Sequence, residues 1–302
     1  MVRRSYAAAI LLLILGLGSQ VGPLGCAERT SPEGGSSATG SLVVVDTSFL
    51  ADIVRQVAGD SFDIVSLVPE GVDPHSFEPT PKDAATIAEA DAIVATHLGL
   101  EPKIVELVQA AAEKGCPVID VSAGIPGAEQ DPHVWLDPVM VLDYYLPNLV
   151  KGLSTVKPEA GTTMSSNAES YGHRLRELDE WIEEQVKSVP AARRLLVSNH
   201  ESLGWFARRY GFAVVGTLLP GQHTEGAPSA ERLVALVTTV KQSGAPAVFL
   251  ETGSDPGLAE QIARETGVAV ITDLYTHSLG EAARTYIEMM EWNAKRIVEA
   301  LS

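Results

Sequence analysis

The loop Asp131-Pro132-His133-Val134-Trp135-Leu136-Asp137-Pro138 places one imidazole between two Asp-Pro turns. Proline fixes its own φ and pushes the preceding residue toward extended geometry, so the chain is stiff on both sides of His133. A second proline-rich loop, Asp73-Pro74-His75, repeats the pattern. Imidazole and carboxylate groups bind borderline divalent cations, and stiff loops hold such ligands in place before the ion arrives. The two loops therefore indicate a metal site.

Both loops follow predicted β-strands in a chain that alternates strands with amphipathic helices. Residues 41–153 predict strands over 42–45, 62–68, 92–95 and 118–121, and helices over 48–58, 81–89, 102–114 and 138–153. Residues 191–302 predict strands over 194–198, 213–217, 247–250 and 268–275, and helices over 201–210, 229–244, 256–266 and 281–301. This order predicts two doubly wound α/β lobes, each with a mostly parallel sheet.

The segment between the lobes, residues 154–190, carries no strand signal. Apolar side chains recur there at helical spacing, at Tyr171, Leu175, Leu178, Trp181, Ile182 and Val186. This periodicity predicts one long helix over about 158–189, which can reach across a whole lobe. A stiff helical connector permits only small motion of one lobe relative to the other.

The first 26 residues have the pattern of a secretory signal peptide. A basic start, Arg3-Arg4, precedes an apolar run over 7–17 that is too short for a permanent membrane span. The small residue before Cys26 resembles a bacterial lipobox, although Pro23 stands where leucine is usual. We expect cleavage before Cys26 and lipid attachment to it, with plain cleavage as the alternative. Residues 27–40, rich in Ser, Gly and Glu, then form a flexible tether.

The net charge of the chain is −17, which argues against nucleic acid as a partner and fits an extracytoplasmic protein that attracts cations. Cys116 is the one cysteine besides Cys26, so the mature chain cannot form an internal disulfide bond. We expect Cys116 to be a buried, inert thiol.

Four of the seven histidines lie just beyond the carboxyl ends of predicted strands. They are His75, His133, His200 and His277. Open parallel sheets bind ligands at that edge, so two sheets facing each other would bring these four rings together. The spacings of 58, 67 and 77 residues exclude a local zinc finger, and tertiary structure must assemble the set. We expect no metal at the remaining three histidines, His97 at a strand end, His173 on the connecting helix and His223 in a loop.

Several longer motifs are similar to those of a known family. They are 73–75 with 77–81, 131–138, 199–201 with 205–211, 225–229, 248–251, and Thr285-Tyr286 with Met289, Met290 and Asn293. From residue 41 onward the chain resembles the cluster 9 (A-I) solute-binding proteins of bacterial ABC importers for zinc and manganese. The resemblance implies two α/β lobes joined by a rigid helix and one metal ion buried between them. It also implies delivery of the ion to a membrane permease. We expect the receptor to be a monomer.

The same resemblance assigns the first three metal ligands to His75, His133 and His200. Manganese-type receptors usually have glutamate at the third place, so His200 favours zinc. The fourth ligand of the family is normally an aspartate, whereas the matching position here holds His277, with Asp273 four residues earlier as the competing ligand. Four neutral imidazoles suit tetrahedral Zn²⁺ and give Mn²⁺, which prefers oxygen, little advantage.

Four carboxylates are candidates to accept hydrogen bonds from the imidazole N–H groups. They are Glu78, Asp131, Asp137 and Glu251, and for each a surface or capping role is the alternative.

We therefore expect a zinc receptor of an ABC importer, with a manganese receptor of the same family as the alternative. A lipid-anchored zinc hydrolase is a candidate from another class, with three histidines, a bound water and Glu201 or Glu251 as base. The chain lacks His-Glu-x-x-His, Gly-x-Ser-x-Gly and a clustered acid pair, which argues against that enzyme. An adhesin or an extracytoplasmic metal chaperone is a third interpretation.

Overall fold

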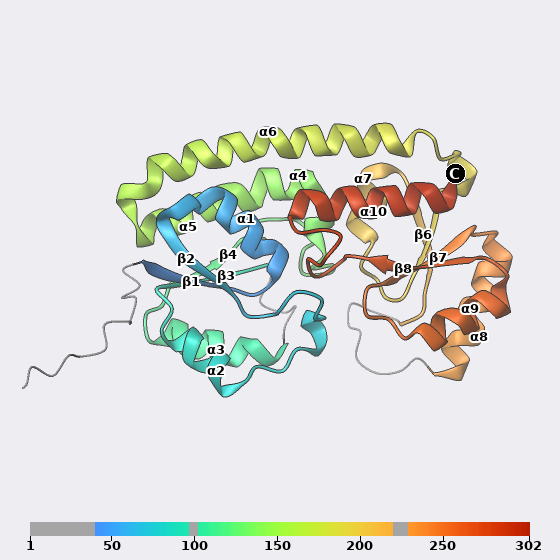
Figure 1. Ribbon diagram of the computed structural model, residues 1–302, viewed down its shortest axis with the longest axis horizontal. Coiled ribbons are helices and arrows are strands. Elements are labelled where there is room, and N and C mark those ends of the chain that lie inside the picture. Colours follow the sequence, from blue (N-terminus) through green and yellow to red (C-terminus); the bar gives the residue numbers. More distant parts are fainter. Residues whose placement is uncertain (1–39, 97–101, 220–228) are drawn as a thin grey trace, which may run out of the picture. The chain divides into compact units, whose positions relative to one another are not determined.

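The computed structural model describes residues 40–96, 102–219 and 229–302, which include both predicted lobes (Figure 1). The predicted signal peptide, Cys26 and the tether up to residue 39 lie outside the described residues, as do His97 and His223. Among the helices that are described, none combines the length and the apolar character needed to cross a bilayer.

The first lobe is built on a four-stranded parallel sheet in the order β2-β1-β3-β4. Its strands are β1 (Ser41–Val45), β2 (Phe62–Ser66), β3 (Ala92–Ala95) and β4 (Val118–Asp120). Alternation along β1 sends Val43 and Val45 to one side of the sheet and Val44 to the other, and all three are fully buried. Helices cover both faces, as Figure 1 shows, with α1 (Ser48–Ala58) and α5 (Leu146–Val156) on one and α2 (Pro81–Ala88) and α3 (Pro102–Glu113) on the other.

The second lobe repeats this arrangement with a parallel sheet in the order β6-β5-β7-β8. Its strands are β5 (Leu195–Ser198), β6 (Ala213–Thr217), β7 (Ala247–Glu251) and β8 (Ala269–Leu274). One face packs against α8 (Ala230–Ser243) and α9 (Pro256–Thr266), and the other against α7 (Gly204–Tyr210) and α10 (Tyr286–Leu301). The predicted fold class is confirmed.

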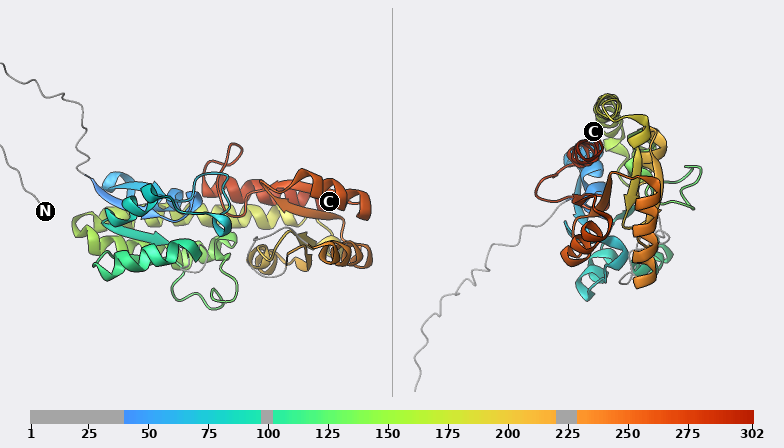
Figure 2. Two further views of the ribbon diagram at one scale, coloured as in Figure 1. Left: turned by 90° about the horizontal axis from the view of Figure 1, so that it is seen from below. Right: turned by 90° about the vertical axis from the view of Figure 1, so that its right-hand side faces the viewer.

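The long connecting helix is α6 (Gly161–Val186), which packs against α1 and α5 of the first lobe and α10 of the second. Figures 1 and 2 show α6 running along both lobes, and beside α10 in the second lobe. One continuous apolar core extends from the first lobe through α6 into the second, and includes Phe49, Leu175, Phe206 and Met289. Because apolar packing of this kind resists sliding and opening, the shared core ties the two lobes together.

Several predicted boundaries were wrong for local reasons. The helix expected over 138–153 is interrupted by a π-helical turn, Val141–Tyr145, between α4 (Pro138–Met140) and α5. The helix expected from residue 201 begins at Gly204, because the His200 carbonyl accepts hydrogen bonds from Ser198 Oγ and from the Ser202 amide in a tight turn. The closing helix begins at Tyr286 rather than at 281, since Thr285 and Glu288 form a capping box.

Cys116 is half-buried rather than buried. It lies just before β4, and its thiol is 3.3 Å from the carbonyl oxygen of Ala90. Burial raises the pKa of this thiol, which favours its protonated form.

A buried carboxylate fastens α6 to the second lobe. Asp179 on α6 accepts hydrogen bonds from the Arg209 guanidinium, with Nε at 2.9 Å, and from the Tyr210 hydroxyl at 3.0 Å. We expect Asp179→Ala to lower the free energy of unfolding by about 2–3 kcal/mol, because it removes the bidentate partner of Arg209 and leaves the buried Tyr210 hydroxyl without its acceptor. Urea denaturation measures this loss, and Glu183→Ala, at the exposed end of the same network, should change stability by less than about 0.5 kcal/mol. Equal effects of the two variants would contradict the prediction.

Asp46, at the end of β1, is a buried carboxyl that accepts hydrogen bonds from the hydroxyls of Thr47 and Thr96. Burial raises its pKa from the ordinary 3.8 to about 6, although these hydrogen bonds act in the opposite direction. The unfolded chain therefore loses this proton at lower pH than the folded chain, and folding stability falls as the pH rises from about 4 to 6.

We expect Asp46→Asn to remove this dependence. The unfolding free energy of the variant minus that of the wild type should increase by about 2–3 kcal/mol as the pH rises from about 4 to 8. Urea denaturation of the metal-free proteins across that range measures it. A difference that does not change with pH would show that Asp46 titrates alike in both states.

Candidate metal site

The two Asp-Pro-His loops of the first lobe have the same local structure. The Asp73 side chain accepts a hydrogen bond from the His75 amide at 3.0 Å, and the Asp131 side chain accepts one from the His133 amide at 3.1 Å. In both loops the proline between them fixes the backbone, so the aspartate and the proline together orient the imidazole. His75 is 2% exposed and His133 is fully buried.

The second lobe contributes His200, two residues after β5, and His277, three residues after β8. The loop that carries His277 is bonded to the first lobe, because the Thr276 carbonyl accepts a hydrogen bond from Trp135 Nε1 at 2.7 Å. The Leu279 amide likewise donates to Ser48 Oγ at 2.9 Å. His277 is therefore held in place by contacts with both lobes.

The four histidines converge on one buried point. Each can offer a ring nitrogen such that the four nitrogens lie within 4.8 Å of one another. His277 Nε2 lies 3.2 Å from His75 Nε2 and 3.1 Å from His133 Nε2, and His200 Nε2 lies 3.3 Å from His133 Nε2. No ring is more than 5% exposed. Four nitrogen donors around one point, two from each lobe, have the composition of a tetrahedral zinc site.

Two of the four candidate carboxylates contact the Nδ1 atoms on the outer side of this cluster. Asp131 Oδ1 is 2.9 Å from His133 Nδ1. Glu251, the last residue of β7, lies 3.2 Å from His200 Nδ1 and 3.5 Å from His277 Nδ1. These distances suit carboxylates that accept the ring N–H and leave Nε2 free to bind an ion.

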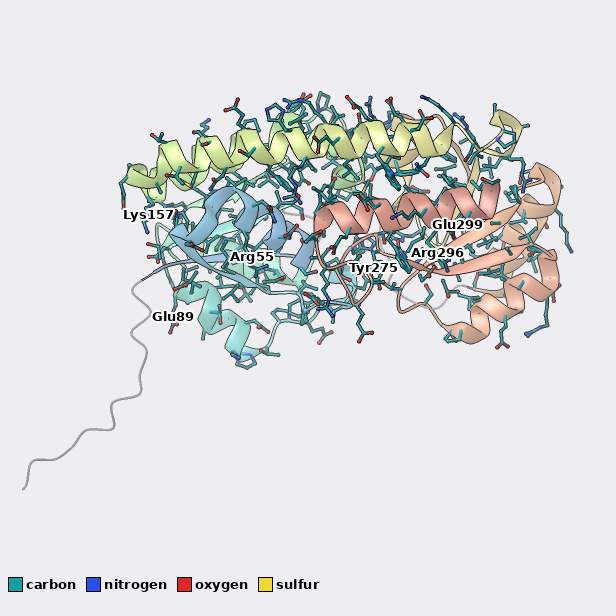
Figure 3. All side chains as sticks on the ribbon, turned by 45° about the horizontal axis from the view of Figure 1, so that its top comes forward. Arg55, Glu89, Lys157, Tyr275, Arg296 and Glu299 are labelled. Carbon is teal, nitrogen blue, oxygen red and sulfur yellow. The ribbon has the colours of Figure 1, made fainter. Side chains whose placement is uncertain are left out.

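The other two candidate carboxylates contact no histidine of the cluster. Glu78 forms an exposed ion pair with Lys103, and Asp137 caps α4 by accepting a hydrogen bond from the Val139 amide. Asp273, the competing fourth ligand, is paired with Arg296 at 2.7 Å. Arg296 projects from α10 beside Glu299 (Figure 3). Asp273 therefore lies in a surface ion pair and not in the histidine cluster.

Burial and charge act in opposite directions on the titrating groups of the cluster. Burial, together with the neighbouring imidazoles, holds the pKa of His133 well below its ordinary value. Burial also disfavours the charged form of His277, but the Glu251 carboxylate outweighs this effect and raises the pKa of His277. Burial alone would raise the pKa of Glu251, yet His277 and His200 hold it well below its usual range. Glu251 is therefore ionised next to two rings.

Three further residues, which were not assigned to the site from the sequence, support these carboxylates. The Ser202 hydroxyl donates to Glu251 at 3.0 Å and the Asn199 amide at 3.2 Å. Gly204 leaves room for Asp131, because a Cβ atom there would lie 2.5 Å from Asp131 Oδ2. Polar residues next to a predicted ligand were a usable signal for Ser202 and Asn199, but nothing local identified Gly204.

A cavity of about 610 Å³ lies beside the histidine cluster and is lined by residues of both lobes. The lining includes His277, Glu251 and Asp73. A hydrated cation in this cavity would meet two carboxylates and one imidazole of the cluster.

Comparison with known proteins agrees with this geometry. A family model described as ZnuA, zinc-uptake complex component A, periplasmic, matches residues 43–300. The manganese-binding lipoprotein MntA of Halalkalibacterium halodurans is 33% identical over 272 residues, which cover 87% of this chain and 89% of that relative. The manganese ABC transporter substrate-binding lipoprotein PsaA of Streptococcus pneumoniae is 28% identical over 312 residues, 98% of each chain.

A solved structure shows the same fold. The periplasmic zinc-binding protein TroA of Treponema pallidum matches with a TM-score of 0.80 at 29% identity, covering 87% of this chain and 99% of TroA. The resemblance to cluster 9 receptors is thereby confirmed. The chain belongs to the ZnuA family of metal-binding, substrate-binding components of ABC importers.

Proposed function

We propose that this protein captures Zn²⁺ outside the cytoplasmic membrane and delivers it to the permease of an ABC importer. The observation that carries the proposal is the convergence of His75, His133, His200 and His277 from two lobes on one buried point. Imidazole must be neutral to bind a metal, and burial favours its neutral form. A buried cluster of four such rings is suited to a metal cation and to few other ligands. Zinc is here the transported substrate.

The donor set favours zinc over manganese. Two relatives are named for manganese and TroA is named for zinc, so similarity alone supports either metal. Four nitrogen donors match the tetrahedral preference of Zn²⁺, whereas Mn²⁺ binds best to carboxylate, carbonyl and water oxygens. No carboxylate oxygen of Asp131 or Glu251 is needed as a ligand, because each already contacts an Nδ1 atom.

The location follows from the leader sequence and from the relatives. A signal peptide over 1–26 with lipid on Cys26 would anchor a monomeric receptor at the outer face of the membrane through the tether. The relatives MntA and PsaA are both named lipoproteins, which supports this arrangement.

The hydrolase interpretation fits the site poorly. A catalytic zinc ion keeps one coordination position for water or substrate, and four converging imidazoles would fill all four positions. Glu251, one of the two candidate bases, lies on the Nδ1 side of the rings rather than facing the point where they converge.

Growth under metal limitation tests the proposed function. Cells that lack this gene should stop growing when zinc is chelated, and added zinc or the restored gene should rescue them. Manganese at the same concentration should not. Rescue by manganese alone would identify a manganese receptor, and growth independent of both metals would exclude the importer role.

A further inference from the structure

The carboxylate of Glu251 lies between the two histidines that the second lobe contributes to the cluster. Oε1 is 3.2 Å from His200 Nδ1, and Oε2 is 3.5 Å from His277 Nδ1. Each oxygen also accepts a hydrogen bond from a neutral group, Oε1 from the Ser202 hydroxyl and Oε2 from the Asn199 amide. The carboxylate is thus fixed at both ends and divided between two rings.

The position of Glu251 is set by the sheet. It ends β7, where the pairing with β8 shifts register between Phe249 and Glu251, so that Glu251 pairs with Leu274. His277 follows three residues after Leu274, and His200 follows two residues after the end of the adjacent strand β5. The strand that lies between β5 and β8 therefore ends in a carboxylate that lies within 3.5 Å of both histidines.

A carboxylate in this position selects one tautomer of each ring. An imidazole that donates its Nδ1–H to an anion keeps the lone pair on Nε2. The Nε2 atoms of His200 and His277 are the ones that face the centre, at 3.3 Å and 3.1 Å from His133 Nε2. Thr276 Oγ1, at 2.9 Å from His277 Nδ1, lies closer to that atom than Glu251 Oε2 at 3.5 Å, so the two residues together define the polar surroundings of the outer side of that ring.

Charge gives Glu251 a second role. Four neutral imidazoles leave both positive charges of a divalent ion uncompensated in a buried site, which is unfavourable. Glu251, with its side chain 11% exposed, and Asp131, 19% exposed, supply two negative charges in contact with the rings. Asp131 serves the first lobe through His133, and Glu251 serves the second lobe.

On the basis of the proposed zinc function, we propose that Glu251 is the positioning residue of the second lobe. It holds His200 and His277 as one preformed pair, with both Nε2 atoms directed at the ion, and it compensates the charge of that ion. Loss of such an outer partner of metal-binding histidines weakens affinity by about 10- to 100-fold.

Glu251→Gln tests this inference, because the uncharged amide can accept from one ring but presents a donor to the other. In the metal-free protein near pH ~8.5, where imidazoles are neutral, we expect one of the two histidines to change from the Nδ1–H to the Nε2–H tautomer. Long-range ¹H–¹⁵N correlation spectra report this change directly. Competition with a chromophoric chelator should show zinc binding weakened by about 10- to 100-fold.

Glu201→Gln is the matched control. It removes the same charge from the residue that follows His200, but Glu201 is exposed and lines a cavity on the Asp131 side of the cluster. It should change neither the tautomers nor, beyond about twofold, the affinity for zinc. Glu251→Asp keeps the charge and serves if the amide variant does not fold; the two rings should then keep the Nδ1–H tautomer.

Unchanged tautomers and unchanged zinc affinity in Glu251→Gln would overturn the positioning role while leaving the zinc function intact. Failure of the wild-type protein to bind zinc would instead refute the proposed function. The two outcomes can be told apart because the tautomers are measured without metal. An equal loss of affinity in Glu201→Gln would show that net charge, rather than contact with the rings, determines binding.

Discussion

Replacing His277 by alanine is expected to weaken Zn²⁺ binding by at least about a hundredfold. Four-ligand structural zinc sites are worth roughly 10–16 kcal/mol in total, so one ligand of four accounts for about 3 kcal/mol or more. His277 is central to the cluster, since its Nε2 atom lies within 3.2 Å of the Nε2 atoms of both first-lobe histidines. Equilibrium competition with a chromophoric zinc chelator measures the loss.

Asp273→Ala is the control for this variant, because Asp273, four residues before His277, is the competing fourth ligand. Its side chain is about one-third exposed and pairs with Arg296 at 2.7 Å, away from the cluster. The affinity for zinc should therefore stay within about twofold of wild type. If Asp273→Ala weakened binding more than His277→Ala, the fourth ligand would have to be Asp273.

The second large effect is the difference between the affinities for Zn²⁺ and for Mn²⁺. We expect the wild-type protein to bind Zn²⁺ at least about a thousandfold more tightly than Mn²⁺, because nitrogen donors follow the Irving–Williams order and Mn²⁺ lies at its weak end. Titration of the metal-free protein with each ion, in the same buffer and against the same competitor, measures the ratio. Equal affinities would show that the ligands are not four imidazoles.

A double variant, His200→Glu with His277→Asp, should reduce the difference between the affinities for Zn²⁺ and Mn²⁺. It introduces two oxygen donors, which Mn²⁺ prefers, and it reduces the number of nitrogen donors that favour zinc. His173→Glu adds one negative charge, half that of the double variant, on the exposed face of α6 and controls for long-range electrostatics. If the ratio of zinc affinity to manganese affinity stayed unchanged in the double variant, the type of ligand would not determine the metal preference.

The loops that present the ligands could be predicted from the sequence, because their geometry is local. Each Asp-Pro-His motif fixes its own backbone, and the hydrogen bonds that the histidine amides donate to Asp73 and Asp131 join residues two positions apart. The alternation of strands and helices likewise predicted both parallel sheets. Thr285 and Glu288 have the spacing of a capping box, so the start of α10 could also have been predicted.

Features that depend on distant residues could not be predicted from the pattern. The role of Glu251 depends on β7 lying between β5, which leads to His200, and β8, which leads to His277. No single segment of the sequence determines this strand order. The choice between His277 and Asp273 depends on Arg296, which lies more than 20 residues after Asp273 in the sequence. Arg296 forms an ion pair with Asp273 at the surface. The π-helical turn Val141–Tyr145 leaves no signal in apolar periodicity.

The four histidines divide equally, His75 and His133 in one lobe and His200 and His277 in the other. In the proposed zinc receptor, each lobe alone would therefore be a weak, two-coordinate chelator. Tight binding then comes from the effective concentration at which the shared core holds one half against the other. A transporter that separates the halves slightly would face two-coordinate sites only, and could remove the ion without competing against all four donors together.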